Sequence, residues 1–587
     1  MISLALQHLK TNFGYDSFRP GQTQIIDNVL GNKDTLVIMP TGGGKSLCYQ
    51  IPALCLEGTT LVISPLISLM KDQVDMLVSS GISAAYINSS LSYEEVQDVM
   101  YGVQSGKIKL LYIAPERLEN ERFCMELSQI NVPLLAIDEA HCISQWGHDF
   151  RPSYRSIQQL LRLWKKKPTV IALTATATEE VSEDIQQLLS IEKKNTFITG
   201  FARENLSFSV LLGENKEAYI KKYVKANENE AGIIYAATRK SVEAVYEMLN
   251  KAGFAVAKYH GGMFEEDRTY EQNRFLNDEV QIMVATNAFG MGINKTNVRY
   301  VLHYNMPRNM ESYYQEAGRA GRDGLDSECI LLYSSSDEQT QRFLIDQAQD
   351  RSRIPFELQK LHAMIDYCHT ERCLQSYIIE YFGDEAGQNC GRCANCTDNR
   401  PQLDVTTDAQ KVLSCIVRMG QKFGKQLTAS VLAGSRSKKV LEFNFQKLPT
   451  YGILRAMNAK EIASFIEFLI SEKLIVVNNG QFPTLSISDE GKEVLLGQKK
   501  VLRKEARIIE STVEPNDPLF EILRKIRKEI ADREKVPPFV VFSDKSLKDM
   551  CVRKPKNSTQ FLEVSGVGES KLEKYGKTFI EAIIANS

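Results

Sequence analysis

Short apolar runs that end in small or polar residues constrain the fold of this chain more than any other feature. In the first part of the sequence these runs are residues 35–39, 61–63, 110–113, 134–137 and 170–173. Parallel strands whose two faces are both covered by helices have this uniformly apolar pattern. Ligands of doubly wound sheets bind beyond the carboxyl ends of the strands, so the polar residues after each run lie where chemistry is expected.

A second series of the same kind follows at residues 233–235, 282–285, 301–304 and 330–333. Two α/β domains in tandem are the simplest arrangement that accounts for both series. We expect the linker between them near residues 200–216. From about residue 336 the alternation stops and helical patterning takes over.

The C-terminal part predicts two smaller units. The first has apolar residues at helical spacing over 462–470, then strand-like runs at 474–477 and 484–487 around an Asn-Asn-Gly turn. A helix followed by a hairpin predicts a winged helix. The second begins near Asp517 and Pro518, a plausible helix start, and apolar side chains from Leu519 to Ile530 line one helical face. This pattern predicts a small helical domain.

Length and charge agree with a soluble multidomain protein. At about 100 to 200 residues per domain, 587 residues correspond to about three to five domains. No apolar run reaches membrane-span length, and residues 1–16 lack the features of a secretory signal, which predicts an intracellular, reducing compartment. The 71 Lys and Arg nearly balance the 73 Asp and Glu, so a polyanion would meet a local groove and not a uniformly basic surface.

Residues 39–46, Met-Pro-Thr-Gly-Gly-Gly-Lys-Ser, form a glycine loop directly after a predicted strand. Backbone N–H groups of such a loop wrap phosphate oxygens, Lys45 reaches the β and γ phosphates, and the Ser46 hydroxyl can ligate Mg²⁺. Met39 stands where the first glycine of the full motif belongs. A plain glycine turn is the alternative.

Asp138 and Glu139 follow the apolar run 134–137. In a nucleotide hydrolase the first acid holds Mg²⁺, and the second orients and polarises the attacking water. An exposed Asp-Glu turn is the alternative, but the glycine loop on the same predicted sheet favours a nucleotide-hydrolysing site.

Arg319 and Arg322, three residues apart, lie in the second α/β unit. Isolated arginines are usually solvated surface residues. A tandem-domain hydrolase, however, needs a cation that reaches the γ-phosphate from the facing domain, and these arginines can supply it. Hydrolysis would then depend on closure of the two domains.

Cys373, Cys390, Cys393 and Cys396 supply four thiolates, the number that closes a tetrahedral zinc site. An iron–sulfur cluster is the rival interpretation, because C-x2-C-x2-C also begins a ferredoxin-type run. The expected fourth cysteine followed by proline is absent, so zinc is favoured.

Residues 141–152 form an aromatic and basic loop that starts beside the paired acids. Trp146 and Phe150 can stack on bases and Arg151 can bind phosphate, so that strand occupancy would be felt at Glu139. Packing of both aromatic residues in a core is the alternative.

Taken together, these motifs resemble the RecQ family of superfamily 2 DNA helicases, from about Phe13 to the C-terminus. The stretches that carry the resemblance are residues 13–22, 39–46, 64–73, 138–152, 172–177, 285–295 and 315–322. The resemblance implies that Tyr15, Arg19 and Gln22 contact adenine. It also makes Met39 acceptable in the glycine loop and selects Cys373, not Cys368, as the zinc ligand.

The resemblance implies two tandem RecA-like doubly wound α/β domains, then a zinc-binding helical subdomain, a winged helix and a small all-α HRDC-like domain. The expected bounds are 1–205, 206–340, 341–405, 406–500 and 512–587.

It also implies site residues, which are as follows. The catalytic set is Lys45, Ser46, Asp138, Glu139, His141, Gln315, Arg319 and Arg322, with Arg322 the preferred arginine finger. The nucleotide set adds Thr41, Gly42, Gly43 and Gly44 to the three adenine contacts, and Ser46 and Asp138 hold Mg²⁺. The DNA-binding set is Gln145, Trp146, His148, Phe150, Arg151 and, at the hairpin tip, Phe482.

The activity implied is an ATP- and Mg²⁺-dependent DNA helicase that moves 3′ to 5′ and unwinds duplex or branched DNA in recombination and repair. Expected cofactors are ATP, Mg²⁺ and Zn²⁺, and expected partners are single-stranded and branched DNA and repair proteins such as single-stranded DNA-binding protein, with no membrane. The layout resembles bacterial members, which implies a cytoplasmic, nucleoid-associated location. Two rivals remain open at this point: an RNA-directed helicase of the DEAH type, and a nucleotide-regulated clamp that binds structured DNA without separating strands.

Overall fold

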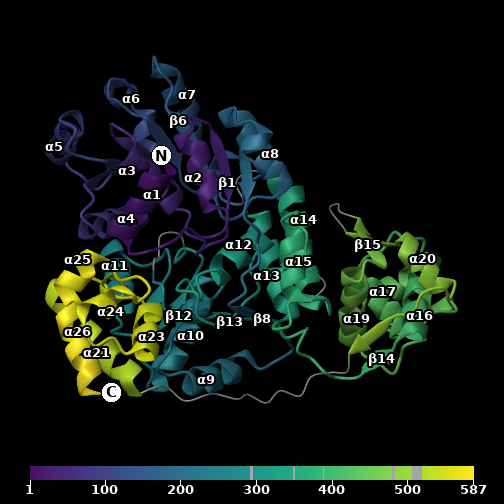
Figure 1. Ribbon diagram of the computed structural model, residues 1–587. Helices are drawn as coiled ribbons and strands as arrows, with labels where there is room; N and C mark the ends of the chain where they lie inside the picture. Colours follow the sequence, from purple (N-terminus) through teal and green to yellow (C-terminus); the bar gives the residue numbers. More distant parts are fainter. Residues whose placement is uncertain (291–294, 348–350, 388, 479–482, 505–517, 587) are drawn as a thin grey trace.

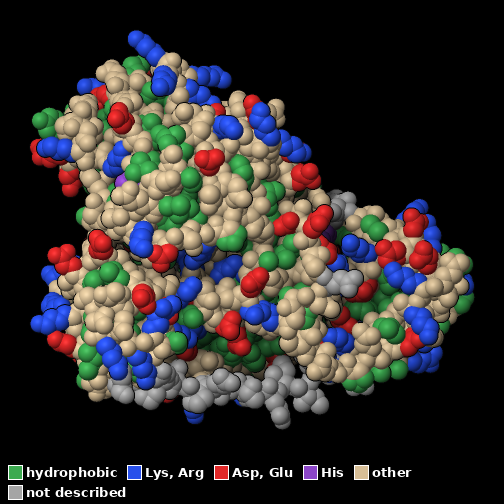
Figure 2. Space-filling model, viewed as in Figure 1, with side chains coloured by type: hydrophobic (Ala, Val, Ile, Leu, Met, Phe, Trp, Pro, Cys, Tyr) green, Lys and Arg blue, Asp and Glu red, His purple; other side chains and the backbone are tan. Residues whose placement is uncertain are grey.

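A computed structural model describes residues 1–290, 295–347, 351–387, 389–478, 483–504 and 518–586. Two α/β domains lie one above the other, a winged-helix domain lies to one side, and a C-terminal helical domain lies against the second α/β domain (Figure 1). Acidic and basic side chains are interspersed over the visible face (Figure 2), which is therefore not uniformly basic. In the described ranges we find no helix that is long and apolar enough to cross a membrane.

The first domain is built on a parallel sheet of order β3-β4-β2-β5-β6-β1-β7. Its strands are β1 (Thr35–Ile38), β2 (Thr60–Ile63), β3 (Ala84–Ile87), β4 (Leu110–Ile113), β5 (Leu134–Ile137), β6 (Thr169–Thr174) and β7 (Thr196–Ile198). Its helices are α1 (Ile2–Phe13), α2 (Gln22–Leu30), α3 (Leu47–Cys55), α4 (Ile67–Ser79), α5 (Tyr93–Gln104), α6 (Glu121–Ser128), α7 (Ser156–Leu163) and α8 (Glu179–Leu189).

The second domain has a parallel sheet of order β10-β11-β9-β12-β13-β8. Its strands are β8 (Leu206–Leu212), β9 (Ala231–Tyr235), β10 (Val256–Tyr259), β11 (Ile282–Ala285), β12 (Val298–His303) and β13 (Ser327–Tyr333). Its helices are α9 (Lys216–Ala226), α10 (Arg239–Lys251), α11 (Glu265–Leu276) and α12 (Met310–Ala317). The tandem α/β architecture predicted from the apolar runs is therefore confirmed.

The strands that the apolar runs did not predict are β3, β7, β8 and β10, and these are the outer strands of the two sheets. Each has partly exposed residues, because an outer strand is covered less completely than a central one. The linker expected over residues 200–216 is wrong in its middle part, where β8 pairs with β13 along its whole length.

The next segment contains α13 (Ser335–Asp346), α14 (Ile354–His369) and α15 (Leu374–Tyr381). The winged helix follows with α16 (Thr406–Arg418), α17 (Lys425–Leu432), α18 (Lys438–Glu442), α19 (Ala459–Ser471), α20 (Asp489–Leu495) and the antiparallel hairpin β15 (Ile475–Asn478) and β16 (Thr484–Ile487). A two-stranded ribbon, β14 (Gln402–Asp404) with β17 (Leu502–Lys504), joins its ends. The predicted helix and hairpin are confirmed, but Phe482 at the tip lies outside the described residues.

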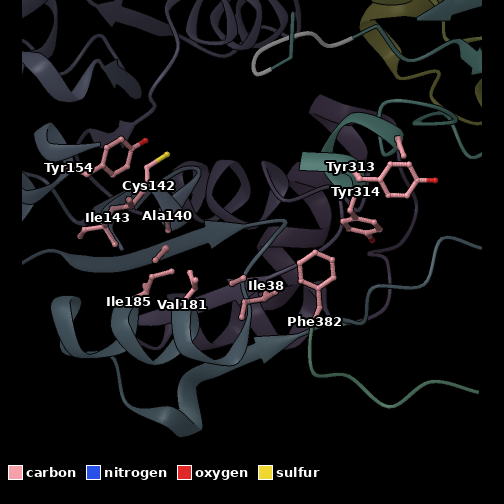
Figure 3. Packing of buried hydrophobic residues seen from close by; sticks show 14 of the residues in the cluster. Ile38, Ala140, Cys142, Ile143, Tyr154, Val181, Ile185, Tyr313, Tyr314 and Phe382 are labelled. Atoms are coloured by element: carbon pink, nitrogen blue, oxygen red, sulfur yellow. The ribbon is translucent and has the colours of Figure 1, made fainter. Parts of the chain in front are cut away.

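One hydrophobic core continues from the first α/β domain through the second into the segment after it. Figure 3 shows part of it, with Ile38 near Phe382 and the α12 residues Tyr313 and Tyr314. Phe201, between the two sheets, stacks on Phe382 with ring centroids 4.6 Å apart, and the Tyr314 hydroxyl donates to the Phe201 carbonyl at 2.8 Å. The two domains are thus packed directly on each other.

The C-terminal domain is all helical, as predicted, with α21 (Pro518–Glu534), α22 (Pro538–Val541), α23 (Asp544–Arg553), α24 (Ser558–Leu562), α25 (Glu569–Lys571) and α26 (Lys577–Ala585). It also touches the first domain: a Cβ at Gly14, where φ is 71°, would lie 2.7 Å from the Gly568 nitrogen, so only glycine fits this approach.

Buried charges join this domain to the second α/β domain. Arg527 in α21 is 1% exposed and donates to Asp544 at 2.7 Å and to the Phe542 carbonyl at 2.8 Å. Its other terminal nitrogen lies 3.8 Å from a carboxylate oxygen of Asp278, which also pairs with Lys295. Lys528 donates to the Asp278 carbonyl at 3.0 Å.

We predict that Arg527→Ala loosens the C-terminal domain, because it leaves the Asp544 carboxylate buried without its cation. Removing one partner of a buried ion pair costs about 3 to 5 kcal/mol. Hydrogen exchange of the α21 amides in the full chain measures the loss. The matched control is Arg553→Ala, which removes a half-exposed pair with Asp549 and should cost about 1 kcal/mol or less. Equal exchange in the two variants would contradict the assignment.

Candidate nucleotide and nucleic-acid site

The glycine loop, residues 39–46, connects β1 to α3 at the carboxyl end of the first sheet. Gly42 and Gly44 have φ angles of 81° and 88°, the left-handed conformation that occurs in anion-binding backbone turns. The Lys45 ammonium donates to the Met39 carbonyl at 3.1 Å. Burial lowers the pKa of Lys45, although the nearby Glu139 and Asp138 oppose this. The loop can therefore hold a phosphate chain beside a partly buried cation.

Two residues of the entry motif lie on this loop. Gln22, at the start of α2, is buried and donates to the carbonyls of Gly43 at 3.3 Å and Gly44 at 3.1 Å. The Arg19 guanidinium donates to the Gly42 carbonyl. Tyr15, in contrast, is 41% exposed beside the end of α1. Arg19 and Gln22 of the predicted nucleotide residues therefore contact the glycine loop, whereas no contact of Tyr15 with the loop is observed among the described residues.

The paired acids lie opposite the loop, directly after β5. Glu139 has a left-handed backbone, with φ 47°. Its Oε2 lies 3.3 Å from Nδ1 of His141, a fully buried ring that also lies 3.0 Å from the Thr174 hydroxyl at the end of β6. Burial, and then the charge of Glu139, raises the pKa of Asp138. Burial opposes ionisation of Glu139 too, but contact with His141, together with the charges of Lys45 and His148, lowers the Glu139 pKa.

The arginine turn, residues 318–322, follows α12 and faces the glycine loop across the domain interface. A Cβ at Gly318 would lie 3.1 Å from the Thr41 side chain, and a Cβ at Gly42 would lie 3.6 Å from the Arg322 Cα. Arg319 is buried, and Arg322 is partly buried. Burial, and then the charges of Arg319 and Arg203, lowers the pKa of Arg322. Gln315 lies on the same helix, half-buried.

Arg203 was missed by the sequence reasoning. Its guanidinium is 8% exposed and donates to four carbonyls: Thr41 of the glycine loop at 2.5 Å, and Gly318, Ala320 and Gly321 of the arginine turn at 3.3, 3.1 and 3.1 Å. These hydrogen bonds therefore connect the glycine loop of the first domain to the arginine turn of the second. The only hint in the sequence was an arginine beside the aromatic residue Phe201 in the expected linker.

The aromatic loop, residues 145–151, leaves the acids and reaches the surface. Gln145 and Trp146 are exposed, Trp146 by 49%, whereas His148 and Phe150 are partly buried. Arg151 donates to the Pro65 carbonyl at 2.9 Å and to Asp149 at 3.1 Å. The His148 ring stacks on His141 with centroids 4.3 Å apart. Core packing of Trp146 is thus wrong: its indole is available at the surface, and its loop touches the acid site.

The four predicted cysteines meet in one cluster, with all sulfur atoms within 4.8 Å of one another. The Cys373–Cys393 and Cys390–Cys396 sulfur atoms are 3.9 Å apart, close to the edge of about 3.8 Å in a tetrahedron with Zn–S bonds of about 2.3 Å. Burial opposes ionisation of Cys373, but N–H groups of Ser376 and Cys390 lower its pKa to about 6. Cys368 is buried in α14, outside the cluster, and burial raises its pKa.

Family models match almost the whole chain in the same order. They are the DEAD/DEAH box helicase (residues 19–185), the helicase conserved C-terminal domain (215–324), RecQ zinc-binding (335–397), the RQC domain (399–511) and the HRDC domain (516–583). The zinc-binding model covers all four clustered cysteines, which supports zinc.

Curated relatives match over nearly their full length. The ATP-dependent DNA helicase RecQ of Bacillus subtilis (strain 168) is 55% identical over 100% of this chain and 99% of its own length. The protein of that name from Haemophilus influenzae is 40% identical, over 99% of this chain and 97% of its own length. The ATP-dependent DNA helicase Q-like 4B of Arabidopsis thaliana is 33% identical over 98% of this chain but 56% of its own length. With its motifs, its domain order and these relatives in agreement, the chain belongs to the RecQ family of ATP-dependent DNA helicases.

Proposed function

We propose that this chain hydrolyses ATP with Mg²⁺, uses the energy to move 3′ to 5′ along single-stranded DNA, and thereby unwinds duplex or branched DNA in recombination and repair. The observation that carries this proposal is the approach of the arginine turn to the glycine loop across the domain interface. A nucleotide bound there would contact both domains, so its binding and hydrolysis would change the closure of the cleft.

In this proposal the phosphates are held by the Lys45 ammonium and by the backbone N–H groups of Thr41, Gly42, Gly43 and Gly44. Ser46 and Asp138 would hold Mg²⁺, since hydroxyl and carboxylate oxygens suit this ion, and the ion would offset the charge of the phosphates. Glu139 accepts a proton from the attacking water, and His141 holds that carboxylate in place. Tyr15, Arg19 and Gln22 contact adenine.

Arg322 is the better candidate for the arginine finger. A Cβ at Gly42 of the glycine loop would lie 3.6 Å from the Arg322 Cα, and the Arg322 charge lowers the pKa of Lys45. Arg319 instead lies beside Gly290 and Tyr235 of its own domain. Gln315 would hold the turn from the same helix. A finger supplied by the second domain makes catalysis conditional on closure.

DNA would meet Gln145, Trp146, His148, Phe150 and Arg151 of the aromatic loop, with Phe482 as a further contact. Single-stranded DNA-binding protein is a proposed partner, and the bacterial nucleoid the proposed location. We also propose the domain bounds 1–205, 206–340, 341–405, 406–500 and 512–587.

Strand displacement is the decisive experiment. A partial duplex with a 3′ single-stranded tail should be separated in the presence of ATP and Mg²⁺, and one with a 5′ tail should not. Lys45→Ala should lower ATP turnover by about 100-fold or more, because it removes a preorganised charge at the phosphates, while DNA binding persists. ATP turnover without displacement would favour the clamp, and stimulation by RNA alone would favour the RNA-directed enzyme.

Trp146→Ala should weaken DNA-stimulated ATP turnover more than basal turnover. Stacking of one base is worth about 1 to 3 kcal/mol, so the DNA concentration for half-maximal stimulation should rise about 5- to 150-fold. Trp164→Phe, at the chain's other tryptophan, which is buried, is the control. An equal loss of basal and stimulated rates in Trp146→Ala would show a structural role only.

Removal of a cluster ligand tests the metal. The wild-type chain should release about one zinc ion on denaturation, and Cys393→Ser should release much less and melt at a lower temperature. Cys368→Ala should keep the full zinc content, because its thiol lies outside the cluster. Iron with the visible absorbance of an iron–sulfur cluster in the wild-type chain would overturn the zinc assignment.

A further inference from the structure

Helix α14 holds the backbone of the aromatic loop. The Lys360 ammonium donates to the Trp146 carbonyl at 3.2 Å, and Arg353 donates to the Gly147 carbonyl at 2.9 Å. The Phe356 ring meets the Trp146 ring edge-on, with centroids 5.4 Å apart. The position of Trp146 therefore depends on a helix that belongs to neither the glycine loop nor the acids.

Lys360 also reaches the second α/β domain. Its ammonium lies 2.6 Å from a carboxylate oxygen of Glu311, and the two side chains are 5% and 3% exposed. Glu311 is in the first turn of α12, the helix that ends at the arginine turn. Breaking one partner of a pair buried this deeply leaves an uncompensated charge. One lysine thus joins the aromatic loop to the helix that leads into the arginine turn.

The aromatic loop also contacts the acid site, through the two residues that follow Trp146. Gly147 packs so closely that a Cβ there would lie 2.2 Å from the His141 carbonyl oxygen. The next residue, His148, stacks on the His141 ring, and that ring touches Glu139. A displacement of the loop backbone would therefore be transmitted to the residue that orients the attacking water.

We propose that Lys360 is a positioning residue that couples DNA occupancy of the aromatic loop to the arginine turn through Glu311. This inference rests on the proposed function. DNA that displaces Trp146 must move the carbonyl that Lys360 holds, and Lys360 cannot follow without shifting Glu311 and α12. The two sides of the nucleotide site then respond together. By reciprocity, a nucleotide that draws the arginine turn inward changes the affinity of the loop for DNA.

A purely structural ion pair is the competing explanation, and the chain offers a matched control. Lys216 pairs with Asp337 at 2.8 Å, with side chains 12% and 2% exposed, and it also donates to the Tyr304 carbonyl. This buried pair does not touch the aromatic loop. Lys216→Met and Lys360→Met should therefore lower the melting temperature to a similar extent, and only the second should affect coupling.

The first measurement is the ratio of DNA-stimulated to basal ATP turnover. It should fall at least about fivefold in Lys360→Met, the lower end of typical couplings between sites, and stay at the wild-type value in Lys216→Met. Lys360→Arg should restore most of the ratio, because arginine can bond both Glu311 and the Trp146 carbonyl. Glu311→Gln, which keeps the side-chain volume, should lower the ratio as well and serves if Lys360→Met does not fold.

The second measurement is fluorescence quenching of Trp146 by acrylamide in a Trp164→Phe background, where it is the only tryptophan. Lys360→Met should make Trp146 more accessible without DNA and reduce the change on adding single-stranded DNA. A wild-type ratio in Lys360→Met, or an equal fall in Lys216→Met, would overturn the proposal. If the wild-type chain itself shows no DNA stimulation, the proposed function fails instead.

Discussion

The contact between the glycine loop and the arginine turn is the constraint on which the rest of the structure depends. It requires two parallel sheets that present their loops to a common interface, and a shared core that holds them there. Arg203 spans the interface with bonds to one carbonyl of the loop and three of the turn. Because those acceptors are backbone atoms, the bonds fix the path of the chain on both sides and leave the side chains of the site available for chemistry.

This arrangement concentrates positive charge at the interface. The cationic side chains there are Lys45, Arg203, Arg319 and Arg322, and the charges of Asp138 and Glu139 act on Lys45. Burial lowers the pKa of Lys45 and of Arg322, and the arginines reinforce the shift in both groups. Buried cations are expensive without counter-charges. A bound triphosphate would supply negative charge where these cations converge, so its binding would offset part of the cost of burying them.

The sequence predicted what depends on local pattern. Central strands such as β1 and β5 are covered on both faces and are apolar throughout, so their positions and the loops after them could be found. The outer strands β3, β7, β8 and β10 are partly exposed and mix polar with apolar residues, so no uniform apolar run marks them. For the same reason the segment that forms β8 was assigned to the linker. Arg203, Glu311 and Lys360 were missed for another reason: each acts through partners more than 40 residues away in the chain, and no local spacing marks such a side chain.

In the proposed coupling, the cysteine cluster would support helix α14, although none of its cysteines belongs to the nucleotide site. Cys373 caps the first turn of α15, with its sulfur accepting from the Ser376 N–H at 3.4 Å. The Tyr377 hydroxyl of α15 donates to the Ala363 carbonyl of α14 at 2.9 Å, one turn from Lys360. A metal that holds Cys373 would therefore restrain α15. Through the Tyr377 hydrogen bond, α15 would in turn restrain the part of α14 whose Lys360 contacts the aromatic loop. In the proposed coupling, a rigid α14 would pass a displacement of Trp146 on to Glu311, so a metal in the cluster would support coupling as well as folding.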